Sequence, residues 1–331
     1  MRESIRSSLN HEKRVLIIEG TRRVVVTCTR CTERSLVVVA IIYFTPNKRF
    51  VMNINARLTM NDEVQIPVFG LGVYLNTEGP QCVSTIKFAL DNGYRHIDTA
   101  EFYGNEESVG QAVISSGLAR EDVFITSKVW STKGGRTDTI RTCSEAVKRA
   151  NIGYFDLYLI HAPQGGHVQE CYEALHELKS RGIVRSVGVS NFGVEHLKAL
   201  QLKALPKPSN NQIELHPWQQ KRDIVEYCRK EGISLTAYSP LTKGQRINDP
   251  VITSIARQLG KTNAQILIKW ALQNNFITIP KSSNKERILE NMQVFDWLIP
   301  DADMRTLNAL GDKPWSCTWD PTRNSLREAG L

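Results

Sequence analysis

The sequence lacks the long apolar segment that a membrane-spanning helix requires. Its longest uninterrupted apolar run, residues 36–44, has nine residues, about half the length needed to cross a bilayer. Internal repeats and low-complexity tracts are absent too. With 41% hydrophobic and 23% charged residues, the composition excludes collagen-like and wholly disordered chains and indicates a folded globular protein.

A strongly basic body is also missing, although the whole chain carries a formal charge of +8 from 42 Lys and Arg against 34 Asp and Glu. Residues 1–52 hold ten basic and four acidic residues and contribute +6, which leaves only +2 for residues 53–331. Nucleic acids and anionic membranes attract proteins through concentrated positive charge. The near-neutral body therefore predicts no nucleic-acid partner and no membrane partner.

The seven cysteines show no disulfide framework and no complete zinc motif. An odd, scattered set in a chain of 331 residues favours free thiols and a cytoplasmic protein. Cys28 and Cys31 form one CxxC pair, but a structural zinc ion needs four ligands and no second pair follows. We therefore expect no metal site.

From Val68 onward, short apolar runs alternate with segments of helical apolar spacing. In residues 82–92, for example, Val83, Ile86 and Leu90 share one helix face. Parallel strands need crossover helices, so eight such units predict an α/β fold, a (β/α)8 TIM barrel. The doubly wound alternative would need a third glycine in residues 70–75. The expected strands are 68–72, 95–98, 123–128, 156–161, 184–190, 211–214, 234–238 and 277–280, and residues 58–66 predict a hairpin.

Four polar residues fall at the ends of neighbouring expected strands, where barrel active sites lie. They are Asp98, Tyr103 just beyond it, Lys128 and His161. A phenol of pKa ~10 is a weak acid at neutral pH, and we expect the Lys128 ammonium, held by Asp98, to lower that pKa. With His161 polarising an oxygen beside Tyr103, the set suits protonation of a carbonyl during reduction, with the hydride supplied by a cofactor.

Taken singly, each of these residues has an ordinary structural explanation. A tyrosine at a barrel mouth is usually a packing residue, and a lone lysine is usually a solvated charge. His161 ends an apolar run and could equally be a core histidine, and Asp98 could cap a helix. Four such residues on three successive strand ends favour the catalytic interpretation. No His-x-His pair marks a metal-dependent hydrolase at these ends.

Five sequence motifs follow one another along the chain. They are GYRHIDTA (93–100, followed by Tyr103 and NEE at 105–107), RSVGVSNF (185–192), NQIELHP (211–217), YSPL (238–241) and IPKSSNKER (279–287). In this order they resemble the motifs of the aldo-keto reductase family, and the resemblance covers about residues 55–325. Within that family, the prostaglandin F synthase-like branch is one candidate.

The resemblance implies a barrel with an N-terminal β-hairpin cap over residues 53–331, and a monomeric reductase of aldehydes and ketones that uses NADPH. Tyr103 would be the proton donor of a tetrad with Asp98, Lys128 and His161. The residues implied in cofactor binding are Ser190, Asn191, Gln212, Tyr238, Ser239, Leu241, Lys281, Ser282, Arg287, Glu290 and Asn291. Among them, the cations Lys281 and Arg287 suit a phosphate. The alternative is an NADPH-binding regulatory or structural relative with negligible turnover.

The expected substrate pocket combines Tyr74, Trp130 and His161. Ala162 and Tyr74 stand where many family members have tryptophan, so the pocket would be wider on those sides. Trp315 and Trp319, in the irregular segment 312–331, have two open interpretations. They either cover the pocket mouth or anchor the segment against the barrel.

Residues 1–52 match nothing in the family and form a separate extension. Because Met52 directly precedes the family-like region, one hypothesis is that the native chain begins there, or that the segment is poorly ordered. The other is a targeting or partner-binding extension, although four glutamates are untypical of a transit peptide.

Overall fold

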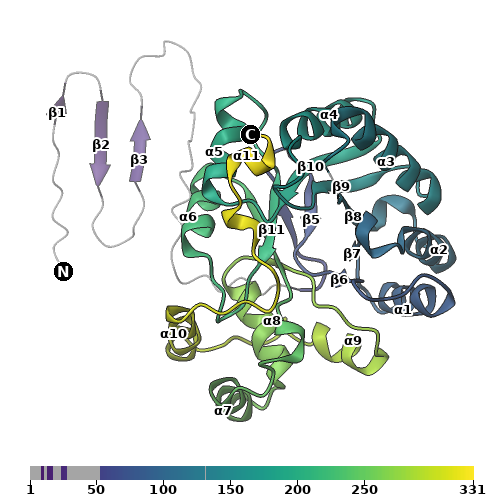
Figure 1. Cartoon of the computed structure of the whole chain (residues 1–331). Helices are drawn as coiled ribbons and strands as arrows, with labels where there is room; N and C mark the ends of the chain where they lie inside the picture. The colour runs from purple at the N-terminus through teal and green to yellow at the C-terminus, as the bar shows by residue number, and fades with distance from the viewer. Residues whose placement is uncertain (1–8, 11–12, 18–23, 28–52, 131) are drawn as a thin grey trace, which may run out of the picture. The chain divides into compact units, whose positions relative to one another are not determined.

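The computed structural model describes residues 9–10, 13–17, 24–27, 53–130 and 132–331 (Figure 1). The chain divides into two units, Met1–Phe50 and Val51–Leu331. In the first unit, β1 (Leu9–Asn10), β2 (Lys13–Ile17) and β3 (Val24–Thr27) form an antiparallel sheet in that order. Cys28, Cys31 and Met52 lie outside the described residues, so the hypotheses about the extension stay predictions.

Eight parallel strands of the second unit form a closed barrel and follow one another in chain order. Parallel bridges from Phe69 to Thr278 and from Gly72 to Lys281 join the first strand to the last. The predicted (β/α)8 fold is confirmed, with strand ends shifted by up to three residues. The strands are β6 (Leu71–Gly72), β7 (His96–Asp98), β8 (Phe124–Val129), β9 (Phe155–Ile160), β10 (Val184–Ser190), β11 (Asn210–Glu214), β12 (Ser234–Tyr238) and β13 (Ile277–Thr278).

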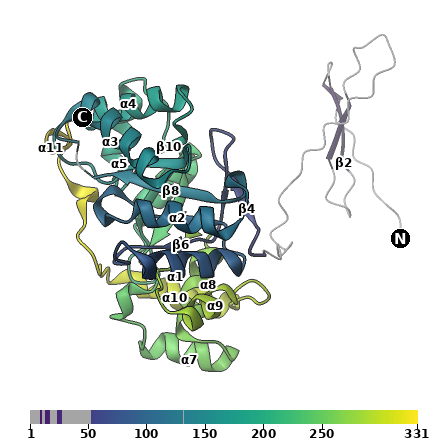
Figure 2. The ribbon, with the colours of Figure 1, turned by 90° about the vertical axis from the view of Figure 1, so that its right-hand side faces the viewer.

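Helices surround the barrel because each buries one apolar stripe against the strands. In α4, for instance, Cys171, Leu175 and Leu178 are buried at helical spacing. Helices α1 to α4 stack in order along one side (Figures 1 and 2). Within the described ranges, no helix is long and apolar enough to cross a membrane. The barrel helices are α1 (Pro80–Asp91), α2 (Glu106–Ser116), α3 (Gly135–Ala150), α4 (Val168–Ser180), α5 (Val194–Leu202), α6 (Arg222–Glu231), α8 (Asn263–Gln273) and α9 (Lys285–Met292).

Additional short elements lie between and after these units. They are the helices α7 (Pro250–Leu259), α10 (Asp301–Ala309) and α11 (Leu326–Ala329), and the 3-10 turns η1 (Glu101–Tyr103), η2 (Arg120–Asp122), η3 (Thr242–Gly244), η4 (Leu310–Asp312) and η5 (Pro321–Arg323). The C-terminal tail, residues 312–331, is otherwise irregular, as the sequence predicted.

The predicted hairpin, β4 (Arg57–Thr59) paired with β5 (Gln65–Pro67), closes the base of the barrel. Its Met60 and Ile66 form a buried cluster with Phe124 and Leu157, which lie near the starts of β8 and β9. Successive side chains point to opposite faces of a strand. Phe124 and Lys128 are four residues apart, so both lie on the face of β8 that points into the barrel. The interior of the barrel is therefore apolar at its base, where Phe124 lies, and carries the Lys128 charge at the carboxyl end of β8.

Helices α2 and α3 approach each other at Gly110. A β-carbon at this position would lie 1.7 Å from the carbonyl oxygen of Ala150, far inside van der Waals contact. This close approach explains a glycine in the middle of a helix, where helical propensity alone disfavours it.

We expect Gly110→Ala to destabilise the second unit by about 3 kcal/mol, because the added methyl forces α2 away from α3. Urea denaturation followed by circular dichroism measures the change as a lower midpoint. Ser115→Ala, at an exposed position of the same helix, is the control and should stay within about 0.5 kcal/mol of the wild type. An unchanged midpoint for Gly110→Ala would contradict the close packing.

Candidate active site

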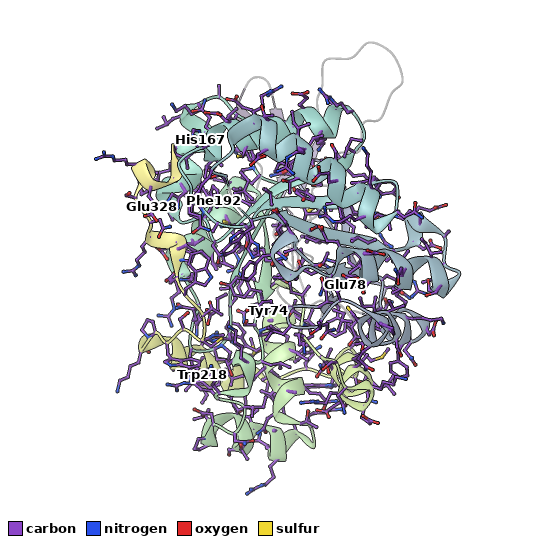
Figure 3. All side chains as sticks on the ribbon, turned by 45° about the vertical axis from the view of Figure 1, so that its right-hand side comes forward. Tyr74, Glu78, His167, Phe192, Trp218 and Glu328 are labelled. Carbon is purple, nitrogen blue, oxygen red and sulfur yellow. The ribbon has the colours of Figure 1, made fainter. Side chains whose placement is uncertain are left out.

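A cavity of about 550 Å³ lies at the carboxyl ends of the barrel strands. Every residue that the sequence predicted for catalysis, cofactor contact or substrate contact lines it, apart from Lys128. Tyr74, labelled in Figure 3, follows β6 and places its ring 5.0 Å from that of Tyr103. The fold thus brings together the predicted site residues from positions 74 to 291.

Lys128 and Asp98 form a buried ion pair at the ends of β8 and β7. The Lys128 Nζ donates to Asp98 Oδ1 at 2.6 Å and to the Thr99 carbonyl at 2.8 Å, and the other Asp98 oxygen accepts from Gln212 Nε2 at 2.6 Å. Burial raises the pKa of Asp98 and lowers that of Lys128, while their mutual attraction opposes both shifts. The pair stays charged because each partner compensates the other.

Tyr103 lies at the end of the short turn η1, and side-chain contacts fix that turn. The backbone N–H of Trp130 donates to Glu101 Oε2 at 2.8 Å. Asn105, buried just after the turn, donates to two backbone carbonyl groups of the loop after β6 at 2.8 and 3.0 Å. The result is a separation of 3.5 Å between Lys128 Nζ and Tyr103 Oη.

The pKa of Tyr103 differs from the sequence-based expectation. Burial raises it well above its ordinary value of 10, and the charge of Asp98 raises it further. The expected lowering by Lys128 was wrong, because burial and then the charge of Asp98 outweigh any attraction between the ammonium and a phenolate. Tyr103 therefore keeps its proton at neutral pH and can serve as a proton donor there.

His161, directly after β9, is held as a neutral imidazole. Burial and the nearby Lys128 charge lower its pKa well below 6.5. Its Nδ1 is buried and has no hydrogen-bond partner within the described residues. The centroid of the His161 ring lies 5.8 Å from the ring centroid of Tyr103 and 5.0 Å from that of Trp130. A neutral imidazole here can donate a hydrogen bond to an oxygen without competing for its proton.

The next strand ends supply a linked polar group. Tyr238 Oη donates to Asn191 Oδ1 at 2.9 Å, Asn191 Nδ2 donates to the His161 carbonyl at 2.9 Å, and Ser190 Oγ donates to the Gln212 carbonyl at 2.8 Å. These bonds fix the Asn191 amide beside the Tyr238 ring, which lines the cavity, while Asp98 holds the Gln212 amide. The arrangement offers a flat aromatic face bordered by amide groups.

Two cationic side chains, Lys281 and Arg287, line the cavity close to each other. Neither Lys281 nor Arg287 forms an ion pair with a carboxylate in the described part of the chain. Burial, and then repulsion by Arg287, lowers the pKa of Lys281. Nearby, Glu290 accepts a hydrogen bond from Thr262 at 2.5 Å. Two adjacent cations without an acidic partner suit a ligand with several negative charges.

Aromatic rings form the remaining wall. Phe102 stacks on Trp130 with centroids 4.3 Å apart, and Trp319 lies 6.0 Å from Trp130. Trp315 instead packs on His216 at 5.9 Å and under Arg246 at 4.6 Å. Of the two open interpretations, Trp319 faces the cavity and Trp315 anchors the tail.

Sequence reasoning missed Phe102 and Thr318, which also line the cavity. Phe102 could have been found from its place in the turn that carries Tyr103. No signal pointed to Thr318, because it lies in the irregular tail. Its position depends on tertiary contacts alone.

Comparison with known proteins identifies close relatives of the chain. Residues 70–312 match the model of the Aldo/keto reductase family. A glyoxal reductase of Bacillus subtilis is 42% identical over 251 residues, which are 76% of this chain and 91% of that protein. A 9,11-endoperoxide prostaglandin H2 reductase of Trypanosoma cruzi is 38% identical over 265 residues, 79% and 94% of the two chains. A Bombyx mori aldo-keto reductase solved in complex with NADP is similar at 32% identity, with a TM-score of 0.71 over 77% of this chain and 92% of its own.

The buried ion pair leads to a stability prediction. In Lys128→Met, Asp98 loses its cation, so we expect a loss of about 3 kcal/mol near pH 8. The pKa of Asp98, already raised by burial, rises further in the variant. A raised pKa destabilises the folded state as pH increases through it, so the loss should shrink near pH 5. Urea midpoints at both pH values measure this.

The double variant Lys128→Met with Asp98→Asn is the control for that experiment. It removes the unpaired charge and should recover much of the lost stability at pH 8. A deficit that is equal at both pH values, or that is not recovered, would contradict the ion-pair account.

Proposed function

The chain belongs to the aldo/keto reductase family, and from this premise we propose that it is an NADPH-dependent reductase of aldehydes and ketones. One observation carries the proposal. Tyr103 Oη lies 3.5 Å from Lys128 Nζ, which is itself 2.6 Å from Asp98, in a cavity shared with His161. A proton donor, its charge support and a neutral hydrogen-bond donor thus meet at one point.

The residues present fit NADPH on the chemistry of the cavity. Lys281 and Arg287 lack acidic partners among the described residues and would hold a phosphate. The Tyr238 ring, with Asn191 and Gln212 beside it, would bind the flat nicotinamide and its carboxamide. When bound, the reduced nicotinamide supplies the hydride that a carbonyl reduction needs.

The chain's own residues then stabilise and neutralise the negative charge that develops on the substrate oxygen. The neutral His161 donates a hydrogen bond that polarises the carbonyl and orients it. Tyr103 gives its Oη proton to that oxygen as negative charge develops. A raised phenol pKa does not prevent this transfer, because an alkoxide is a much stronger base than a phenolate. Lys128 stabilises the phenolate that remains, and Asp98 keeps Lys128 in place.

Two relatives indicate the range of candidate substrates. The glyoxal reductase and the prostaglandin H2 reductase are named for oxygen-containing substrates of very different size, so both small and large carbonyl compounds are candidates.

We also propose that the protein is monomeric and cytoplasmic. Support for the cytoplasm comes from the cysteines of the described ranges, which are all free thiols.

Tyr103→Phe tests the proton donor. We expect kcat for 4-nitrobenzaldehyde to fall by about 10³-fold, because the phenol proton is removed while the ring stays. The decrease in absorbance at 340 nm with NADPH measures turnover, and quenching of protein fluorescence measures NADPH binding, which should be retained. Because the pKa of Tyr103 lies well above 10, its titration should not affect the wild-type rate between pH 6 and 9.

Tyr227→Phe, on the outer helix α6, is the matched control and should keep wild-type turnover. Normal turnover in Tyr103→Phe would refute the assigned donor. If the wild type binds NADPH but reduces neither aromatic nor aliphatic aldehydes, the reductase proposal fails, and a binding-only relative is the better description.

Lys281→Ala with Arg287→Ala tests the phosphate contacts. Each charge-assisted contact contributes a factor of about ten, so the KM for NADPH should rise by about 100-fold. The KM for NADH, which lacks the 2′-phosphate, should change little. Lys285→Ala, a nearby exposed lysine, is the control. A wild type that uses both cofactors equally well would contradict these roles.

A further inference from the structure

A second buried carboxylate, Glu214, lies at the carboxyl end of β11 and binds the C-terminal tail. One oxygen accepts from the backbone N–H of Cys317 at 2.7 Å and from His216 Nε2 at 2.8 Å. The other accepts from Ser316 Oγ at 2.6 Å and from the hydroxyl of Thr318. Three consecutive tail residues therefore bind one side chain that is only 1% exposed.

These hydrogen bonds keep the carboxylate ionised despite its burial. Burial would raise the pKa of Glu214, but donation from His216, Ser316, Thr318 and Cys317 outweighs it and lowers the pKa to about 2. A lowered pKa stabilises the folded state above the ordinary value of 4.5, and that contribution is lost as the pH falls toward about 2. Near neutral pH, Glu214 is thus an ionised acceptor for these four donors.

The anchored residues continue directly into the active site. The Thr318 hydroxyl lies 3.2 Å from Tyr238 Oη, which donates to Asn191 at 2.9 Å. The next residue, Trp319, is 48% exposed, lines the cavity and packs edge-on against Trp130, with ring centroids 6.0 Å apart. The position of this wall therefore depends on where residues 316–318 are held.

Separate contacts hold the tail on both sides of this stretch. Before it, the backbone N–H of Trp315 donates to the backbone carbonyl of Trp218 at 2.9 Å. After it, Asp320 pairs with Lys221 at 2.6 Å. Loss of the Glu214 contacts would therefore free residues 316–319 without detaching the whole tail.

We propose that Glu214 is a positioning residue that fixes Thr318 and Trp319 as the outer wall of the substrate pocket and thereby favours large aromatic carbonyl substrates over small ones. This inference rests on the proposed reductase function. Because Tyr103 and Trp319 line the same cavity, a large aromatic aldehyde held at Tyr103 would extend to the Trp319 wall. A small aliphatic aldehyde would contact only the residues around Tyr103 and His161.

Glu214, His216 and Cys317 also have the donor types of a zinc site, with ligand atoms within 4.8 Å of one another. Both carboxylate oxygens already accept two hydrogen bonds each, so protein groups suffice to hold the tail. An ion-dependent anchor is a distinct outcome of the test, because it would respond to a chelator.

The experiment measures tail order and substrate preference in the same variants. Glu214→Met removes all acceptors at similar size, and Glu214→Gln keeps one acceptor oxygen. For Glu214→Met, we expect the KM for 4-nitrobenzaldehyde to rise by about tenfold, and that for propanal to change by less than about twofold. Glu214→Gln should lie between. Hydrogen–deuterium exchange of residues 313–325 should be slowest in the wild type, faster in Glu214→Gln and fastest in Glu214→Met. EDTA should not alter exchange in the wild type.

Asp156→Asn is the matched control, since Asp156 is a carboxylate of 1% exposure that binds Arg120 and Arg185 at the start of β9. It should change neither tail exchange nor the KM ratio. Ser316→Ala removes one of the donors to Glu214, and Ser316 does not line the cavity. This variant replaces Glu214→Met in the experiment if Glu214→Met does not fold. Its KM for the aromatic aldehyde should rise by about threefold.

Unchanged tail exchange in the folded Glu214 variants, or increased exchange on EDTA treatment of the wild type, would overturn the anchor. Faster exchange with an unchanged KM ratio would overturn its role in substrate preference. If the wild type reduces no aldehyde, the reductase proposal fails and the inferred preference with it. The exchange data then still decide whether Glu214 anchors the tail.

Discussion

The buried ion pair of Lys128 with Asp98 is the central interaction of the candidate active site. Two charges removed from water are costly unless each finds a partner and further hydrogen bonds. The barrel supplies them from neighbouring strands, with the Thr99 carbonyl on the lysine and the Gln212 amide on the aspartate. Because these groups lie at the carboxyl ends of strands, the opposite end can be apolar, and the hairpin closes it with Met60.

The same principle, a buried charge matched by fixed partners, operates a second time at Glu214. Asp98 is balanced by a cation, and its charge adds to burial in keeping Tyr103 protonated. Glu214 is balanced by neutral donors from the tail, and these contacts define the outer wall. Under the proposed function, one buried carboxylate supports the proton transfer and the other shapes the substrate space around it.

Much of the fold and of the site was predictable because both depend on local patterns. Apolar runs separated by helical spacing revealed the eight strands, and the strand ends revealed Asp98, Lys128 and His161. The pKa of Tyr103 was predicted in the wrong direction, because the sequence places Asp98 and Lys128 near the phenol but does not show how deeply the phenol is buried. The tail was undecided for a similar reason, since Thr318 is held by Glu214, 104 residues away. Such contacts follow from the folded barrel and not from any local pattern.

Burial, together with the charge of Asp98, leaves Tyr103 protonated at neutral pH and ready to give up its proton. NMR of protein labelled with ¹³C at the tyrosine Cζ, assigned with Tyr103→Phe, measures this directly because the Cζ shift changes when the phenol ionises. We expect the Tyr103 signal to keep the chemical shift of a protonated phenol from pH 6 to pH 10. A Tyr103 signal that titrates near neutral pH would contradict it.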